Sequence, residues 1–149
     1  MMEYFGNEKL LDKPKVAFMA SRRVASEEVL RFYDWATCQA DARQCVVSGF
    51  NSKLEKDVLH FLLKLKCPVI VMLARKMYAE LPEEWQIAIN ESRMLIVATS
   101  LAVRQSKQTA EKRNQFVAQI CEKVYLAGVG EHSSLQGLMQ EYAEKCIMM

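Results

Sequence analysis

The chain has few of the residues that mark disulfide-stabilised or zinc-binding proteins. Its 149 residues include two histidines, three prolines, five glycines and five cysteines, and no two cysteines form a Cys-x-x-Cys pair. An odd number of widely spaced cysteines is typical of a reduced environment, and two isolated histidines give no zinc-ligand spacing. We therefore expect small buried thiols, no metal site and no cofactor.

Long hydrophobic runs are also missing. The longest, Pro68–Ala74, is far shorter than the roughly 20 residues of a membrane-spanning helix. Residues 1–15 mix acidic with basic side chains and do not have the pattern of a signal peptide. These features predict a cytoplasmic protein with no membrane partner.

Neither sign of charge dominates. The 20 Lys and Arg residues against 18 Asp and Glu give a net charge of +2, too small to attract a polyanion by bulk electrostatics. Any phosphate or nucleic-acid site must therefore be built from a few placed cations. With 51% hydrophobic and 26% charged residues, the composition excludes a disordered chain and predicts a soluble globular protein.

What the chain does have is an alternation of short apolar runs with longer amphipathic stretches, typical of repeated βα units. The predicted strands are Val16–Ala20, Cys45–Ser48, Val69–Leu73, Met94–Ala98 and Lys123–Ala127. The predicted helices are Ser26–Gln39, a helix capped by Ser52 and Glu55 that runs to Leu65, Pro82 to about Asn90, a helix from about Thr109 that carries Ile120, and a last helix from near Ser133 to about Lys145. No linker divides the chain, so we expect one domain over residues 1–149, with residues 1–14 as an N-terminal extension.

Hydroxyl, glycine and basic residues follow the predicted strands. In a parallel sheet the ligand crevice lies beyond the carboxyl ends of the strands. Serines, arginines and helix N-termini suit a phosphate there, although capping serines and glycine turns are common in all α/β proteins. Gly128 and Gly130 lack the third glycine of a dinucleotide fingerprint and follow the last strand, so they are weak evidence for NAD.

Taken in order, these loops resemble the DprA/Smf family of DNA-processing proteins, within the superfamily that also holds the LOG-type nucleotide-processing proteins. The run Val16–Arg22 is similar to the family's first strand and Gly-Ser-Arg turn, with Ala20 in place of the glycine. Val46–Phe50 is similar to its Val-Ser-Gly-Leu turn, Tyr78–Trp85 to its Tyr-Pro-x-x-Asn region, and Arg113-Asn114 to its Arg-Asn pair. Residues 132–138 keep only Ser134 and Leu135 of its Ser-Gly-Ser-Leu stretch. Lys53 and Glu55 replace a glycine and an aspartate, and His60 is shifted by one position.

The resemblance implies a three-layer Rossmann-like α/β fold with a mostly parallel five-stranded sheet and helices on both faces. It implies a bacterial protein that binds single-stranded DNA and delivers it to a recombinase in DNA uptake and recombination, without covalent chemistry. The expected nucleic-acid or phosphate contacts are Ser21, Arg22, Ser48, Gly49, Phe50, Lys53, Arg113, Asn114, Ser133 and Ser134. Arg22 and Arg113 are the first choices for phosphate contacts. Further cations either extend the positive surface at the carboxyl ends of the strands or are ordinary surface charges: Arg23, Arg75, Lys76, Arg104, Lys107 and Lys112.

Several alternatives stay open at this stage. Phe50 would either stack on a base or cover the end of the sheet, whereas Trp35 and Trp85 are better explained by core packing or a dimer contact. Glu55 is better explained by the capping box than as a general base, and His132 by an exposed turn. No catalytic arrangement can be argued from spacing alone.

Three functions compete on this evidence. The first is single-stranded DNA binding, and the second is binding or processing of a phosphorylated nucleotide in the same pocket. The third is a scaffold that has lost its ligand. The resemblance also implies a homodimer, for which Tyr142 and Ile147 are candidate interface residues.

Overall fold

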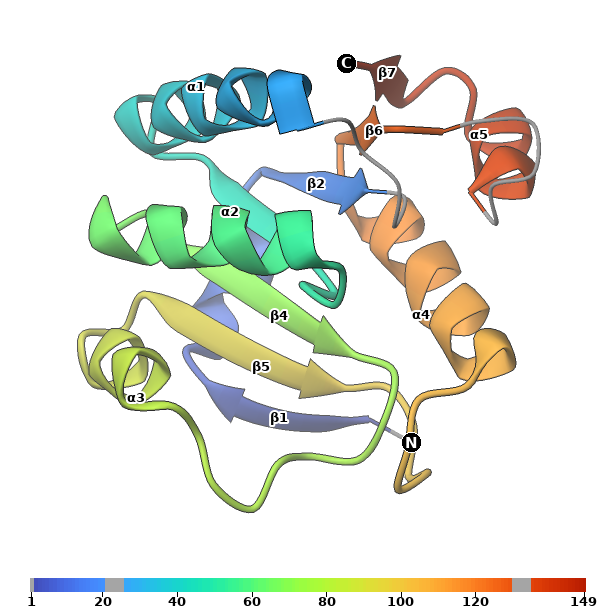
Figure 1. The fold of residues 1–149 in the computed structure, drawn as a ribbon. Helices are drawn as coiled ribbons and strands as arrows, with labels where there is room; N and C mark the ends of the chain where they lie inside the picture. The colour runs from blue at the N-terminus through green and yellow to red at the C-terminus, as the bar shows by residue number, and fades with distance from the viewer. Residues whose placement is uncertain (1, 21–25, 130–134) are drawn as a thin grey trace.

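One mixed β-sheet organises the protein in the computed structural model, which describes residues 2–20, 26–129 and 135–149 (Figure 1). The sheet has seven strands in the order β1-β5-β4-β3-β2-β6-β7. They are β1 (Glu3–Gly6), β2 (Lys15–Ala20), β3 (Cys45–Ser48), β4 (Val69–Leu73), β5 (Met94–Ala98), β6 (Lys123–Ala127) and β7 (Cys146–Met148). β1 is antiparallel to β5, and the other neighbouring pairs are parallel.

The prediction of five strands is wrong in number, although each predicted strand is present. Four keep the predicted bounds, and the first begins one residue earlier, at Lys15. The two additional strands lie at the edges of the sheet. β1 has no buried residue and β7 has only three residues, so neither carries the continuous apolar run by which a central strand is recognised.

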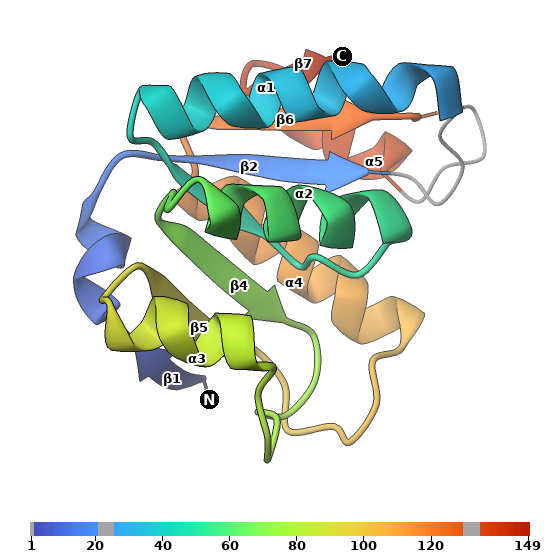
Figure 2. The same cartoon turned by 60° about the vertical axis from the view of Figure 1, so that its left-hand side comes forward.

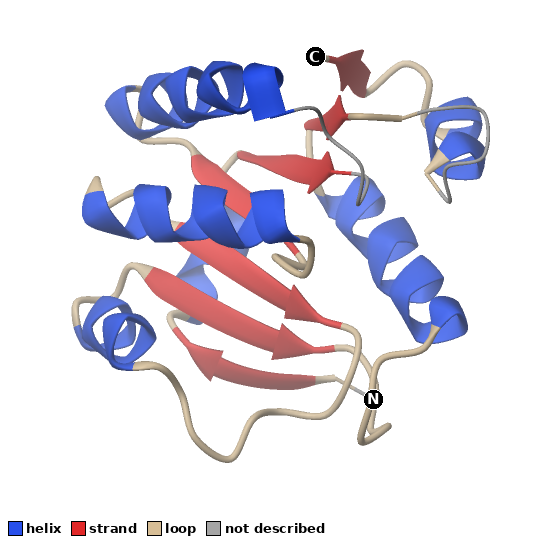
Figure 3. Cartoon of the chain, viewed as in Figure 1, coloured by secondary structure: helices blue, strands red, loops and turns tan. Residues whose placement is uncertain are grey.

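Helices cover both faces of the sheet, as predicted (Figures 2 and 3). One face is covered by α1 (Val29–Asp41), α2 (Lys53–Lys64) and α3 (Glu83–Asn90). The other is covered by α4 (Lys107–Ile120), α5 (Gln136–Glu141) and the 3-10 helix η1 (Glu8–Asp12), while a short 3-10 turn, η2 (Ser26–Glu28), leads into α1. Alternate residues of each central strand point into one or the other core, as the pleat of a strand requires.

The last helix is shorter than predicted. It ends at Glu141 because Tyr142 leaves the helical conformation, with φ −114° and ψ 37°. The Lys145 ammonium then donates to the carbonyls of Ala118 and Gln119 at the end of α4, at 3.0 and 3.3 Å. These contacts lead the chain into β7 instead of another helical turn.

An aromatic cluster fills the core beneath α1. The Trp35 ring stacks on Phe18 with centroids 5.0 Å apart, and it packs against Tyr125 at 5.1 Å. Phe18 also meets Phe32 edge to face. Of the two roles expected for Trp35, core packing or a dimer contact, the structure shows core packing.

Three of the five cysteines are buried in the two cores. Burial raises the pKa of Cys45, Cys67 and Cys121 to about 12 in each case, whereas Cys38 is exposed. All five are free thiols, so the expectation of small buried thiols holds for these three and not for Cys38. In the described part of the chain, no helix is long and apolar enough to cross a bilayer, and no three potential metal ligands gather.

We expect iodoacetamide to modify Cys38 much faster than the three buried cysteines at pH 8. With a pKa of about 12, only about one buried thiol in ten thousand is ionised at that pH, and the thiolate is the reactive form. Mass spectrometry of peptides after timed labelling would measure the order. Rapid labelling of Cys45 in folded protein would contradict this expectation.

Candidate nucleic-acid interface

The strand order places the candidate site at the carboxyl edge of the sheet. The chain passes from β2 through β3 and β4 to β5 on one side of β2, and then crosses to β6 on the other side, and this reversal of strand order is where α/β proteins form their ligand crevice. Residues 21–25 follow β2, and residues 130–134 follow the end of β6. The predicted contacts Ser21, Arg22, Ser133 and Ser134, together with Arg23 and His132, lie outside the described residues.

A tight turn after β3 forms the described part of this edge. Ser48 is fully buried, and its hydroxyl accepts a hydrogen bond from the Phe50 N–H at 3.1 Å. Phe50 has a left-handed backbone, with φ +50°, which is uncommon for a residue other than glycine. Its side chain is 4% exposed and packs in the core, which favours the interpretation that Phe50 covers the end of the sheet.

Glu55 ties this turn to β2. The capping box is confirmed, because the Ser52 hydroxyl accepts from the Glu55 N–H at 3.2 Å, while Glu55 Oε1 accepts from the Ser52 N–H. Oε1 also accepts from the Asn51 N–H at 2.8 Å, and Oε2 accepts from the Ala20 N–H at 2.9 Å. The carboxylate of Glu55, a residue that is 8% exposed, thus joins the end of β2 to the start of α2.

Arg113 braces the same turn from the opposite side. Arg113 is 5% exposed: its Nε donates to Asn114 Oδ1 at 2.7 Å, and its Nη1 donates to the Met72 carbonyl at 3.1 Å. In the amide orientation that satisfies its neighbours, Asn51 Oδ1 accepts from Nη1 at 3.0 Å and from Nη2 at 3.2 Å. Burial lowers the pKa of Arg113, and the charge of Glu55 acts in the opposite direction.

Gly49 gives the guanidinium its space. A Cβ built at this position would overlap Arg113 Nη1 and lie close to Cζ. A side chain at residue 49 and the buried arginine therefore exclude each other. Of the predicted contacts, Ser48, Gly49, Phe50, Arg113 and Asn114 come together here, and the structure gives each a part in holding the turn.

Cations surround the turn and form a surface that we call the basic rim: Lys53, Lys76, Arg104 and Lys107, which are exposed, and Arg75, which is half-buried. Lys53 and Lys107 begin α2 and α4, and the other three follow β4 and β5. The Lys76 N–H donates to the Ala102 carbonyl at 2.8 Å, which joins the last two loops. The Arg75 guanidinium lies over the Tyr78 ring, 4.3 Å from its centroid.

Few acidic partners neutralise this rim among the described residues. Lys53 pairs with Asp57 at 3.5 Å, but its side chain is 91% exposed, so the pair is weak. Lys112 is also exposed, farther along α4. These cations follow the carboxyl ends of the strands or lie on the helices after them, whereas Arg113 is buried and is not part of the surface.

Neither the contact of Asn51 with Arg113 nor the contact of Glu55 with Ala20 could be predicted from the sequence. The Ser52 capping box indicated where the Glu55 backbone lies, but not that its second oxygen reaches another strand. That contact follows only from the adjacency of β2 and β3. Two features of the sequence point toward this contact: Ala20 is the last residue of a predicted buried strand, and Glu55 is an acidic residue in the capping box of the next predicted helix but one.

The strand order and this rim define a Rossmann-like α/β protein with its candidate site at the strand reversal. Residues 1–137 match the family model described as DNA recombination-mediator protein A, and the chain belongs to this family. The resemblance seen in the sequence is thereby confirmed. No curated protein matches the sequence.

Two solved structures of DNA processing protein A share the fold. The Helicobacter pylori protein is 21% identical with a TM-score of 0.77, and the match covers 99% of this chain and 70% of that one. The Streptococcus pneumoniae protein is 15% identical with a TM-score of 0.67, and the match covers 99% of this chain and 62% of that one. The chain thus spans about two thirds of the length of these proteins.

Proposed function

We propose that the chain binds single-stranded DNA along the basic rim, as a DNA-processing protein without covalent chemistry. The observation that carries the proposal is a set of exposed cations at the sheet edge where the fold places ligands. Family membership supports it, and the related Helicobacter pylori protein has been described with a distinctive single-stranded DNA binding mode. The family match favours this proposal over binding of a mononucleotide.

Different residues would have different parts in binding. The cations of the basic rim would contact the phosphates, and Ser21 and Arg22, which follow β2 in the sequence, would add further contacts. Glu55, Arg113 and Gly49 keep the turn after β3 in shape, so these residues act as positioning residues. Contacts of this kind are electrostatic, so affinity depends steeply on salt and little on base sequence.

A variant that removes three rim cations, Lys76→Ala/Arg104→Ala/Lys107→Ala, is expected to weaken binding to a labelled oligonucleotide. The slope of log K against log salt should fall by about 2, since each phosphate contact to a single strand contributes roughly 0.7. Fluorescence anisotropy from low to moderate salt would measure both effects.

The matched control is Lys13→Ala/Lys64→Ala/Lys123→Ala, which changes the net charge equally. These three exposed lysines lie near the amino ends of the parallel strands, away from the rim. The control should keep the slope of the original protein. Equal losses in the two triple variants, or no binding by the original protein at low salt, would show that the rim does not bind DNA.

The wider role is also a proposal. We place the protein in the cytoplasm, where it would deliver single-stranded DNA to a recombinase, and we propose a homodimer. The exposed side chain of Ile147 lies on β7, at the edge of the sheet, whereas the Tyr142 hydroxyl donates to Gln115 Oε1 at 3.2 Å. Ile147 is therefore the better of the two predicted interface residues.

A further inference from the structure

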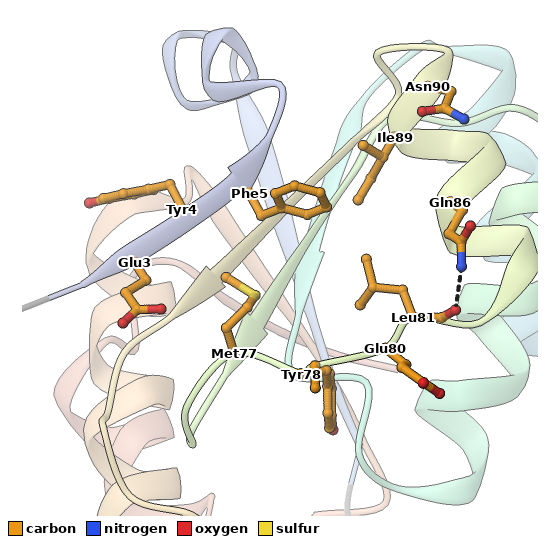
Figure 4. Close-up of a pocket in the computed structure, with 11 residues that line it drawn as sticks. Glu3, Tyr4, Phe5, Met77, Tyr78, Glu80, Leu81, Gln86, Ile89 and Asn90 are labelled. Atoms are coloured by element: carbon orange, nitrogen blue, oxygen red, sulfur yellow. Dashed lines mark hydrogen bonds between the residues drawn. The ribbon is translucent and has the colours of Figure 1, made fainter.

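A hollow lies beside β1, at the opposite edge of the sheet from β7. It has a volume of about 810 Å³ and is bounded by β1, the segment 77–81 and α3 (Figure 4). Phe5, Met77, Leu81 and Ile89 form apolar walls that face one another across it. The Phe5 side chain is 50% exposed, because α3 covers the neighbouring strands and leaves β1 open on this face.

The charge of this hollow is opposite to that of the basic rim. Its two charged lining residues, Glu3 and Glu80, are both acidic, and no lysine or arginine lines it. Both carboxylates are on exposed residues, with no ion pair among the described residues. This field repels nucleic acid and attracts a cationic partner.

β1 adds an unused hydrogen-bonding edge. The Asn7 N–H donates to the Met94 carbonyl, so residues of the same parity, Glu3 and Phe5, turn their backbone groups toward β5. The N–H and C=O of Tyr4 consequently point away from the sheet. β1 contains no lysine or proline, the residues with which proteins commonly protect exposed edges.

We propose that this groove binds an extended basic peptide segment of a partner protein, which adds a strand to β1. Backbone pairing with β1 would supply part of the affinity, as in other cases of strand addition. Alternate apolar side chains of the segment would enter the groove beside Phe5 and Ile89, and its lysines and arginines would meet Glu3 and Glu80. The proposal is independent of DNA binding at the rim.

The test uses a labelled, end-capped peptide of nine residues in which Val and Ile alternate with Lys and Arg. Fluorescence anisotropy with the full chain should show salt-sensitive binding. The charge reversal Glu3→Lys/Glu80→Lys should weaken it at least about tenfold, since it turns attraction into repulsion. Glu111→Lys/Glu122→Lys, with the same change in charge at exposed sites outside the groove, should leave binding within about twofold of the original.

Two further probes separate strand addition from charge attraction alone. The same peptide with N-methyl groups on alternate residues cannot complete the backbone pairing, so it should bind at least about tenfold more weakly. Replacing its Lys and Arg by Glu should abolish binding. The proposal is overturned if the basic peptide does not bind at low salt, if the methylated or acidic peptide binds equally well, or if both charge reversals have the same effect. Light scattering that showed self-association lost on Phe5→Ala would also overturn it, because the occupant would then be a second copy of this chain.

Discussion

Glu55→Ala is expected to lower the free energy of unfolding by about 2–4 kcal/mol. The substitution removes the acceptor for the N–H groups of Ala20, Asn51 and Ser52 at once, and only part of this loss can be made up by water. It also removes the negative charge that acts on the buried guanidinium of Arg113. Urea denaturation followed by tryptophan fluorescence would measure the change.

Asp57→Ala is the matched control for this prediction. It removes a carboxylate from the same helix, α2, but one that is partly exposed and pairs only with the exposed Lys53. Its effect should stay below about 0.5 kcal/mol. If Glu55→Ala and Asp57→Ala had equal effects, the carboxylate between β2 and α2 would not contribute to stability.

Gly49→Ala is expected to destabilise the protein by about 2–3 kcal/mol through the arginine that it displaces. The new Cβ would overlap the guanidinium of Arg113, which must then leave the Met72 carbonyl or the Asn114 side chain. The backbone conformation of Gly49 does not contribute to this loss of stability, because Gly49 is not among the glycines with positive φ. The same variant should also weaken DNA binding, since it distorts the turn inside the basic rim.

Gly137→Ala provides the comparison. This glycine lies in α5 with open space where a Cβ would be, so alanine should leave stability unchanged or raise it by up to about 1 kcal/mol. Thermal unfolding of the two variants side by side would show the difference. A Gly49→Ala protein as stable as Gly137→Ala would mean that Arg113 has another position of equal energy.

The central strands could be predicted closely because each is buried on both faces. A parallel strand covered on both faces is a short, nearly continuous apolar run, and Cys45–Ser48 and Val69–Leu73 both have this pattern. β1 and β7 could not be predicted in this way, because an edge strand can be polar or very short. The groove beside β1 could not be predicted either, because the sequence pattern indicates only an N-terminal extension over residues 1–14.

The candidate site was predictable in composition but not in the roles of its residues. Motif order brought Ser48, Gly49 and Arg113 to one place, which the structure confirms. Their burial depends on partners distant in sequence: the carbonyl that Arg113 contacts belongs to Met72, 41 residues earlier. An arginine beside a predicted rim is normally a surface residue, and only the packing of α4 against β4 makes this one internal.

The contacts of Glu55 also bear on the order in which the native state is assembled. The bond to Ala20 joins residues 35 positions apart, and it needs β2 and β3 to be paired and α2 to be formed already. Bringing Ala20 and Glu55 together costs the conformational entropy of the chain between them, and the pairing of β2 with β3 offsets this cost. We therefore expect this carboxylate to join its partners after the main folding barrier, in which case Glu55→Ala raises the unfolding rate in stopped-flow measurements far more than it lowers the folding rate.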